Sequence, residues 1–204
     1  MQALTMTPLN LNFTQMKILA LRPYLMLFVL FAGCSQLSLG QRYLTNKGYI
    51  HFLSDAPLER IEAESNELQG ILDPTNNEFA FAVSIRSFQG FNSGLQREHF
   101  NENYMKSEEF DKGTFIGTVV EEVNFKEPGT YEVRAKGKMT IHGISQERII
   151  KVQLIVGDGW IKIEADFTIL LSDHDISIPR IVRQKISEEI EVHVQATLSK
   201  KSGE

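Results

Sequence analysis

Cysteine is nearly absent from this chain, since Cys34 is the only one in 204 residues. A single cysteine cannot form a disulfide within the chain, so the fold must be stabilised by its hydrophobic core. The length is sufficient for one such core together with an export signal. We therefore expect a single domain without disulfides, and the sequence shows no internal repeat that would indicate a second one.

Catalytic motifs are absent as well. The sequence contains no phosphate-binding glycine loop, no dinucleotide fingerprint and no hydrolase elbow, since the serine of segment 90–94 does not open a helix after a parallel strand. Asp173, His174 and Asp175 carry metal-binding groups, but three adjacent residues rarely converge on one ion. We expect a protein that is not an enzyme and that binds neither a cofactor nor a metal.

The amino-terminal apolar run, residues 24–32, is too short to cross a membrane. It is roughly 10 residues long, whereas a membrane-spanning helix needs about 20. Lys17 and Arg22 precede the run and small residues follow it, which is the composition of a secretory signal. We predict a signal peptide over residues 1–40, with Met16 as an alternative start, and a periplasmic or secreted domain over residues 41–204.

Two processing sites compete at the end of this signal. Ser38 and Gly40 are small residues at positions −3 and −1 before Gln41, which suits ordinary signal peptidase. Residues 32–34 resemble a lipoprotein box in which Cys34 would carry a lipid anchor, although Phe31 departs from the usual aliphatic residue. We favour cleavage before Gln41.

Basic residues are fewer than acidic ones in this chain, 21 against 26. Removal of residues 1–40 takes away two of the 21 basic side chains and none of the 26 acidic ones, which leaves a net charge of −7. This balance argues against binding to nucleic acid or to an anionic membrane surface, because both favour basic patches.

Alternation of apolar and polar residues is the dominant pattern after residue 43. Phe79, Phe81, Val83 and Ile85 are separated by single residues, and the same period of two recurs in 131–141, 161–171 and 190–198. Such alternation indicates strands with one buried and one solvated face, and it excludes a parallel sheet covered by helices. We predict eight strands, at residues 43–54, 59–72, 78–89, 114–125, 130–141, 146–157, 160–171 and 187–199.

Short turns, such as 142–143 and 157–159, separate most of these strands, so sequential strands should pair antiparallel. Eight antiparallel strands can close into a barrel, which removes exposed edges. Two connections are longer. In the first, Phe91, Leu95 and His99 are four residues apart, which predicts one helix or two short ones over 93–105 at an end or edge of the barrel. The second, 172–186, should be a loop.

The predicted inward face also contains small residues, among them Gly117, Ala135, Gly137 and Ala165. Two interpretations remain open for them. A barrel of about eight strands can hold one small ligand, and small inward side chains would leave volume for it. Alternatively, they let the strands coil sharply.

Three segments in order resemble the YceI-like family. They are the run 95–115 with His99-Phe100, Tyr104-Met105 and Thr114-Phe115, the run 140–144, and the run 167–179, and the similarity extends over about residues 43–198. The resemblance implies a lipocalin-like eight-stranded barrel that is often exported and, in some members, holds a polyisoprenoid chain. It supplies no catalytic residues, and it allows a homodimer.

The resemblance therefore implies an exported lipid-binding protein that serves as carrier, store or sensor of a polyisoprenoid, a quinone-like lipid or a similar long apolar chain. The alternative function is a ligand-free interaction module that binds a protein through its surface, which an exposed apolar patch on the helix 93–105 would favour. His142 is either a polar anchor for the ligand or a turn residue that hydrogen-bonds the backbone, and we favour the second. Strand parity predicts a tunnel lined by Phe79, Phe81, Val83, Ile85, Phe115, Val119, Tyr131, Val133, Met139, Ile141, Val152, Leu154, Ile163, Phe167, Val192 and Val194.

Overall fold

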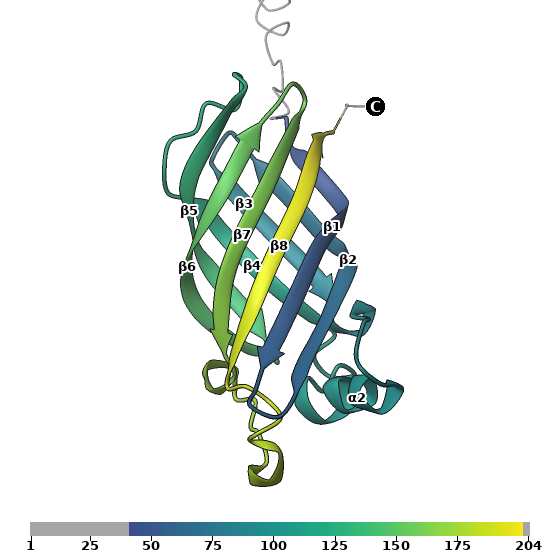
Figure 1. Ribbon diagram of the computed structural model, residues 1–204. Coiled ribbons are helices and arrows are strands. Elements are labelled where there is room, and N and C mark those ends of the chain that lie inside the picture. The colour runs from purple at the N-terminus through teal and green to yellow at the C-terminus, as the bar shows by residue number, and fades with distance from the viewer. Residues whose placement is uncertain (1–40, 202–204) are drawn as a thin grey trace, which may run out of the picture. The chain divides into compact units, whose positions relative to one another are not determined.

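The computed structural model describes residues 41–201, so the predicted signal peptide lies outside the described residues. Eight strands pair in chain order and β8 pairs back with β1, which closes the sheet into an antiparallel barrel (Figure 1). The predicted all-β, eight-stranded barrel is confirmed. The strands are β1 Tyr43–Asp55, β2 Arg60–Asp73, β3 Glu78–Ser84, β4 Lys112–Val119, β5 Gly129–Ile141, β6 Ile144–Val156, β7 Trp160–Leu170 and β8 Glu189–Lys200.

The strands bury every second side chain, as the alternation predicts. In β5 the side chains of Val133 and Ala135 are buried, whereas those of Arg134 and Lys136 are exposed. Successive side chains of a strand point to opposite faces, so one face of each strand builds the barrel interior. None of the helices in this part of the chain is long and apolar enough to cross a membrane.

Two strands end earlier than predicted. β3 stops at Ser84 rather than at residue 89, because the chain turns into a short 3-10 helix, η1 Ile85–Ser87, in which the Ser87 hydroxyl donates to the Ser84 carbonyl at 2.7 Å. β4 stops at Val119 rather than at residue 125. The carboxylate of Glu121 accepts the backbone N–H of Arg134 at 2.6 Å, so it takes the place of a strand carbonyl and the ladder with β5 ends.

The two ends of the barrel differ. We call the end with the β2–β3, β4–β5 and β6–β7 connections the closed end, because side chains fill it. Ile161 and Leu198 are fully buried there, and Phe125 of the β4–β5 connection packs into the same core. We call the opposite end the mouth end.

The mouth end carries the two long connections. Between β3 and β4 lie a short α-helix, α2 Gly94–His99, and a π-helical turn, η2 Phe100–Tyr104, so the helical segment predicted at 93–105 is present in two parts (Figure 1). Between β7 and β8 the predicted loop contains two short 3-10 helices, η3 Leu171–His174 and η4 Arg180–Val182.

Candidate functional site

A cavity of about 540 Å³ lies inside the barrel. Side chains from all eight strands line it, together with residues of α2, η2 and the loop between β7 and β8. Its volume falls within the range of about 300–1,000 Å³ that is typical of small-molecule sites. Ile161 and Leu198 of the closed end are not among its lining residues, whereas the exposed Leu95 and Lys185 of the mouth end are. The cavity therefore opens toward solvent at the mouth end.

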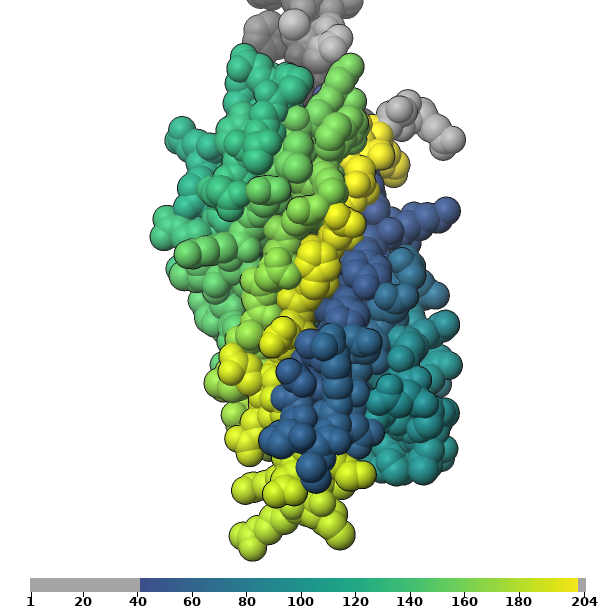
Figure 2. All heavy atoms as spheres, viewed as in Figure 1, coloured from purple at the N-terminus to yellow at the C-terminus, as the bar shows by residue number. Residues whose placement is uncertain are grey.

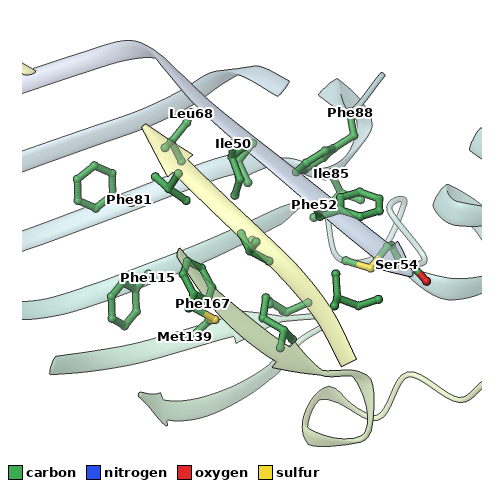
Figure 3. Close-up of a pocket in the computed structure, with 18 of the residues that line it drawn as sticks. Ile50, Phe52, Ser54, Leu68, Phe81, Ile85, Phe88, Phe115, Met139 and Phe167 are labelled. Atoms are coloured by element: carbon green, nitrogen blue, oxygen red, sulfur yellow. The ribbon is translucent and has the colours of Figure 1, made fainter. Parts of the chain in front are cut away.

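Fifteen of the sixteen residues predicted to line a tunnel do line this cavity, and the exception is Tyr131. In Figure 3 several of them, including Phe81, Phe115, Met139 and Phe167, surround the same space. Tyr131 lies near the start of β5 at the closed end, where its hydroxyl donates to the Asn124 carbonyl at 3.4 Å. The alternation in β5 correctly predicts that Tyr131 faces inward. It lies at the closed end, however, where side chains fill the barrel and leave no cavity. A ligand-binding role for the fifteen stays a prediction.

Several residues line the cavity that the strand pattern did not predict. Ile50 and Phe52 of β1 line the cavity, and their alternation could have identified them. Leu68 of β2 lines it too, but a register shift between β1 and β2 moves the inward positions from Ser65 to Leu68, so alternation alone would not have found it. Phe88 also lines it, although a continuous third strand would have turned Phe88 outward. The early end of β3 changes the direction of the chain, so that Phe88 lies with Phe52 (Figure 3).

Aromatic rings close over part of the mouth end. The ring of Phe52 lies 5.4 Å from those of both Phe88 and Phe100, and Phe100 lies 5.0 Å from Phe91, measured between ring centroids. Aromatic pairs at such separations contribute beyond the area they bury, by about 0.5–1.5 kcal/mol each. The helical connection is thereby held against β1, with its aromatic face toward the cavity.

The small inward residues divide between the two interpretations. Ala135 and Ala165 line the cavity, so their short side chains contribute directly to its volume. Gly117 and Gly137 are paired across β4 and β5, and a β-carbon on either one would collide with the backbone of the other strand. These two glycines therefore permit close approach of the strands and do not widen the cavity.

Polar lining residues gather at the mouth end. The carboxylate of Glu59 accepts from the Gln96 amide at 3.0 Å, and its other oxygen lies 3.6 Å from the Lys185 ammonium. Tyr104 also lines the cavity, and burial raises the pKa of its hydroxyl above the usual value. Deeper in the barrel the lining is apolar. The arrangement suits an amphiphile with an apolar chain inside and a polar group outside.

His142 lies outside the cavity lining. It forms a two-residue turn with Gly143 in which both have positive φ, 50° and 74°, while Ile141 pairs with Ile144. Such turns match the twist of the flanking strands. The buried imidazole Nδ1 lies 3.1 Å from the His174 carbonyl, which fits the turn interpretation that we favour, and a role as ligand anchor stays an alternative to be tested.

His174 is similarly structural, because it is buried and its Nδ1 lies 3.1 Å from the Ile144 carbonyl. Within residues 41–201, no group of three histidine, cysteine or acidic side chains is arranged to hold a metal ion.

Comparison with solved structures gives the same architecture. A polyisoprenoid-binding domain from Saccharophagus degradans matches with a TM-score of 0.64 and 12% identity, over 78% of this chain and 98% of the other. BcnA of Burkholderia cenocepacia gives 0.60 and 12%, over 74% and 96%. The YceI protein of Campylobacter jejuni gives 0.51 and 15%, over 65% and 78%.

A search of curated protein sequences gave no match. The family model of the YceI-like domain, in contrast, matches residues 50–198, which extend from the middle of β1 nearly to the end of β8. This range includes six of the eight cavity-lining strands, β2 to β7, in full. The chain therefore belongs to the YceI-like family.

Proposed function

We propose that this protein binds a polyisoprenoid or a similarly long apolar lipid, with the apolar chain inside the barrel. The observation that carries the proposal is the cavity of about 540 Å³, apolar in its depth and polar at its mouth. The similarity in fold to a domain described as polyisoprenoid-binding supports the same ligand class. A quinone with an isoprenoid tail belongs to that class as well.

Burial of area is sufficient to account for binding. Each buried methylene contributes about 0.8 kcal/mol before ordering costs, and micromolar affinity requires about −8 kcal/mol. A few isoprene units supply this, even after the cost of immobilising the chain. A charge deep in the cavity would oppose binding, and Glu59 and Lys185, the lining residues that carry a formal charge, both lie at the mouth end.

The polar mouth gives the ligand an orientation. The Glu59 carboxylate contacts both the Gln96 amide and the Lys185 ammonium where the cavity meets solvent. A lipid bound with its tail inside would place its polar end beside these groups. Both hydrogen-bond donors and acceptors are available there, which suits an alcohol, a phosphate or a quinone ring.

We also propose export. Residues 1–40 would act as a signal peptide that is cleaved before Gln41, with lipid attachment at Cys34 as the competing route. The protein would then serve as carrier, store or sensor of the lipid outside the cytoplasm. Sequencing the amino terminus of the exported protein distinguishes the two routes, because only the first begins at Gln41.

A cavity-filling substitution tests the lipid site. Ala165 lines the cavity, so Ala165→Phe should occupy part of it and lower the affinity for an added polyprenol at least tenfold. Thr168→Phe on the same strand is the matched control, because Thr168 is exposed on the outer wall. Titration of both variants with a fluorescent polyprenol analogue, monitored by the fluorescence of the ligand, provides the measurement. Equal affinity of the two variants would contradict a ligand inside the barrel.

A further inference from the structure

Three large apolar side chains are solvent-exposed at the mouth end. Ile181 is 91% exposed, Leu58 66% and Leu95 60%, and they come from three different connections: the β7–β8 loop, the β1–β2 turn and α2. Hydrogen bonds join these connections. The Leu58 N–H donates to the Gln184 carbonyl at 2.8 Å.

Glu59 completes the link between the three connections, because its carboxylate contacts Gln96 of α2 and Lys185 of the loop. We call the set formed by Leu58, Leu95 and residues 178–186 the rim. Its three exposed apolar side chains therefore belong to one structure around the opening of the cavity.

The rim is basic, although the domain is acidic. Arg180 and Arg183 are exposed, no acidic residue occurs between 176 and 187, and Lys185 is paired with Glu59, whereas residues 41–204 carry a net charge of −7. The side chains of Arg180 and Arg183 make no ion pair or hydrogen bond with other residues of the described range 41–201. They are free to contact an external anion.

The loop has two faces. Val182 and Ile186 line the cavity, while Arg180, Ile181 and Arg183 are turned to solvent. In Figure 2 the loop, in yellow-green, projects beyond the strands at the mouth end. The same short loop therefore lines the cavity with one face and exposes its other face to solvent at the mouth end.

We propose that the rim docks on an anionic lipid bilayer, with the cavity mouth facing the membrane. Separate apolar tips flanked by arginines suit insertion among lipid head groups, where an isolated leucine or isoleucine reaches the acyl boundary and the guanidinium groups meet phosphates. The acidic net charge of the domain does not prevent this, because charges beyond about 8 Å are largely screened at physiological ionic strength.

A lipid surface fits the rim better than a protein does. A contiguous apolar patch on the helical connection would favour a protein partner. Instead, Phe91, Phe100 and Tyr104 pack toward the barrel, and Leu95 is the one large apolar side chain of 93–105 that is mostly exposed. Docking goes beyond the proposed lipid binding and does not depend on it, because an empty barrel would present the same rim.

Two matched triple variants test the docking. The rim variant is Arg180→Gln, Ile181→Ser and Arg183→Gln. The wall variant is Lys136→Gln, Lys138→Gln and Ile149→Ser, which removes the same two charges and a 59% exposed isoleucine from the outer face of β5 and β6. The protein is used from Gln41 onward, a compact unit that holds all eight strands.

Cosedimentation is measured with vesicles of equal parts phosphatidylglycerol and phosphatidylcholine, and with phosphatidylcholine alone. We expect salt-sensitive binding to the anionic vesicles only. Each lost arginine should weaken it about fivefold, and the loss of the inserted isoleucine should weaken it further, so the rim variant should bind at least about 25-fold more weakly. The wall variant should bind as the unchanged protein does.

Thermal unfolding and polyprenol uptake of the rim variant should match those of the unchanged protein, which separates docking from lipid binding. Failure of the unchanged protein to bind anionic vesicles would overturn the proposal and leave a protein as the partner of the rim. Equal losses of vesicle affinity in the rim and wall variants would also overturn the proposal, because binding would then depend on total charge and not on the rim.

Discussion

At the scale of single residues, Gly117 is a position where even one added methyl group should destabilise the fold. A β-carbon there would collide with the Lys136 carbonyl and lie 2.5 Å from the Gly137 Cα. We expect Gly117→Ala to lower the free energy of unfolding by about 1–3 kcal/mol, as overpacking does. Gly94→Ala is the control, since no atom lies within 4 Å of its β-carbon and no loss is expected. Urea denaturation of both variants measures this, and equal stability would contradict the close approach of β4 and β5.

His142 offers a test of the turn interpretation. His142→Ala removes the contact with the His174 carbonyl and places alanine at a φ of 50°. We expect the free energy of unfolding to fall by about 1–2 kcal/mol, while the affinity for polyprenol stays unchanged. A folded variant that has lost polyprenol affinity would instead make His142 a ligand anchor.

Inward-facing residues were largely predictable, because parity within an alternating strand depends only on local sequence. Phe115, Met139 and Phe167 were identified in this way. Parity fails where the strand itself ends, as at Phe88, and it carries no information about depth, which is why Tyr131 was included. The contact between Glu59 and Lys185 joins residues far apart in the chain, and no sequence pattern indicated it.

At the scale of elements, the number and order of strands were predictable and two of their ends were not. Val123 and Phe125 keep the inward parity of Phe115 and Val119, which predicts a strand up to residue 125. The ladder stops before them where the Glu121 carboxylate accepts the Arg134 amide. Arg134 is adjacent in space and distant in sequence. The helical connection was predicted from the spacing of its aromatic residues, but its division into an α-helix and a π-helical turn was not.

The β2–β3 turn gives a pH-dependent prediction. The Thr75 N–H, and after it the Arg42 guanidinium, hold the pKa of Asp73 below its usual value near 3.8. A lowered pKa in the folded state stabilises the protein above the ordinary pKa, and this contribution is lost as the pH falls through the lowered value. We expect Asp73→Asn to lower stability by about 0.5–1 kcal/mol at pH 7.

The difference between Asp73→Asn and the unchanged protein should shrink below pH 3.8 and vanish in stronger acid. Asp158→Asn in the β6–β7 turn is the matched control, because Asp158 makes no side-chain hydrogen bond with another residue of the range 41–201. Urea denaturation at several pH values measures both variants. A constant difference across the acid range would show that Asp73 stabilises the turn without its charge.

At the scale of the whole molecule, closure of the barrel divides it into a filled end and a hollow end. Ile161 and Leu198 occupy the filled end without residual exposure. At the other end the two long connections hold aromatic side chains around the opening, and Gln96 and Lys185 of these connections contact Glu59 of the β1–β2 turn. Closure and strand order followed from the sequence, whereas this asymmetry depends on how the connections fold over the ends.

Native mass spectrometry of the protein, purified from its host without detergent and followed by organic extraction, shows directly whether the barrel holds a lipid. We expect a reproducible extra mass that extracts as a polyprenyl or quinone species, because the cavity is apolar in its depth and open at its mouth. Bare protein that also fails to take up added polyprenol would contradict lipid binding inside the barrel. The protein would then be an interaction module that acts through its surface.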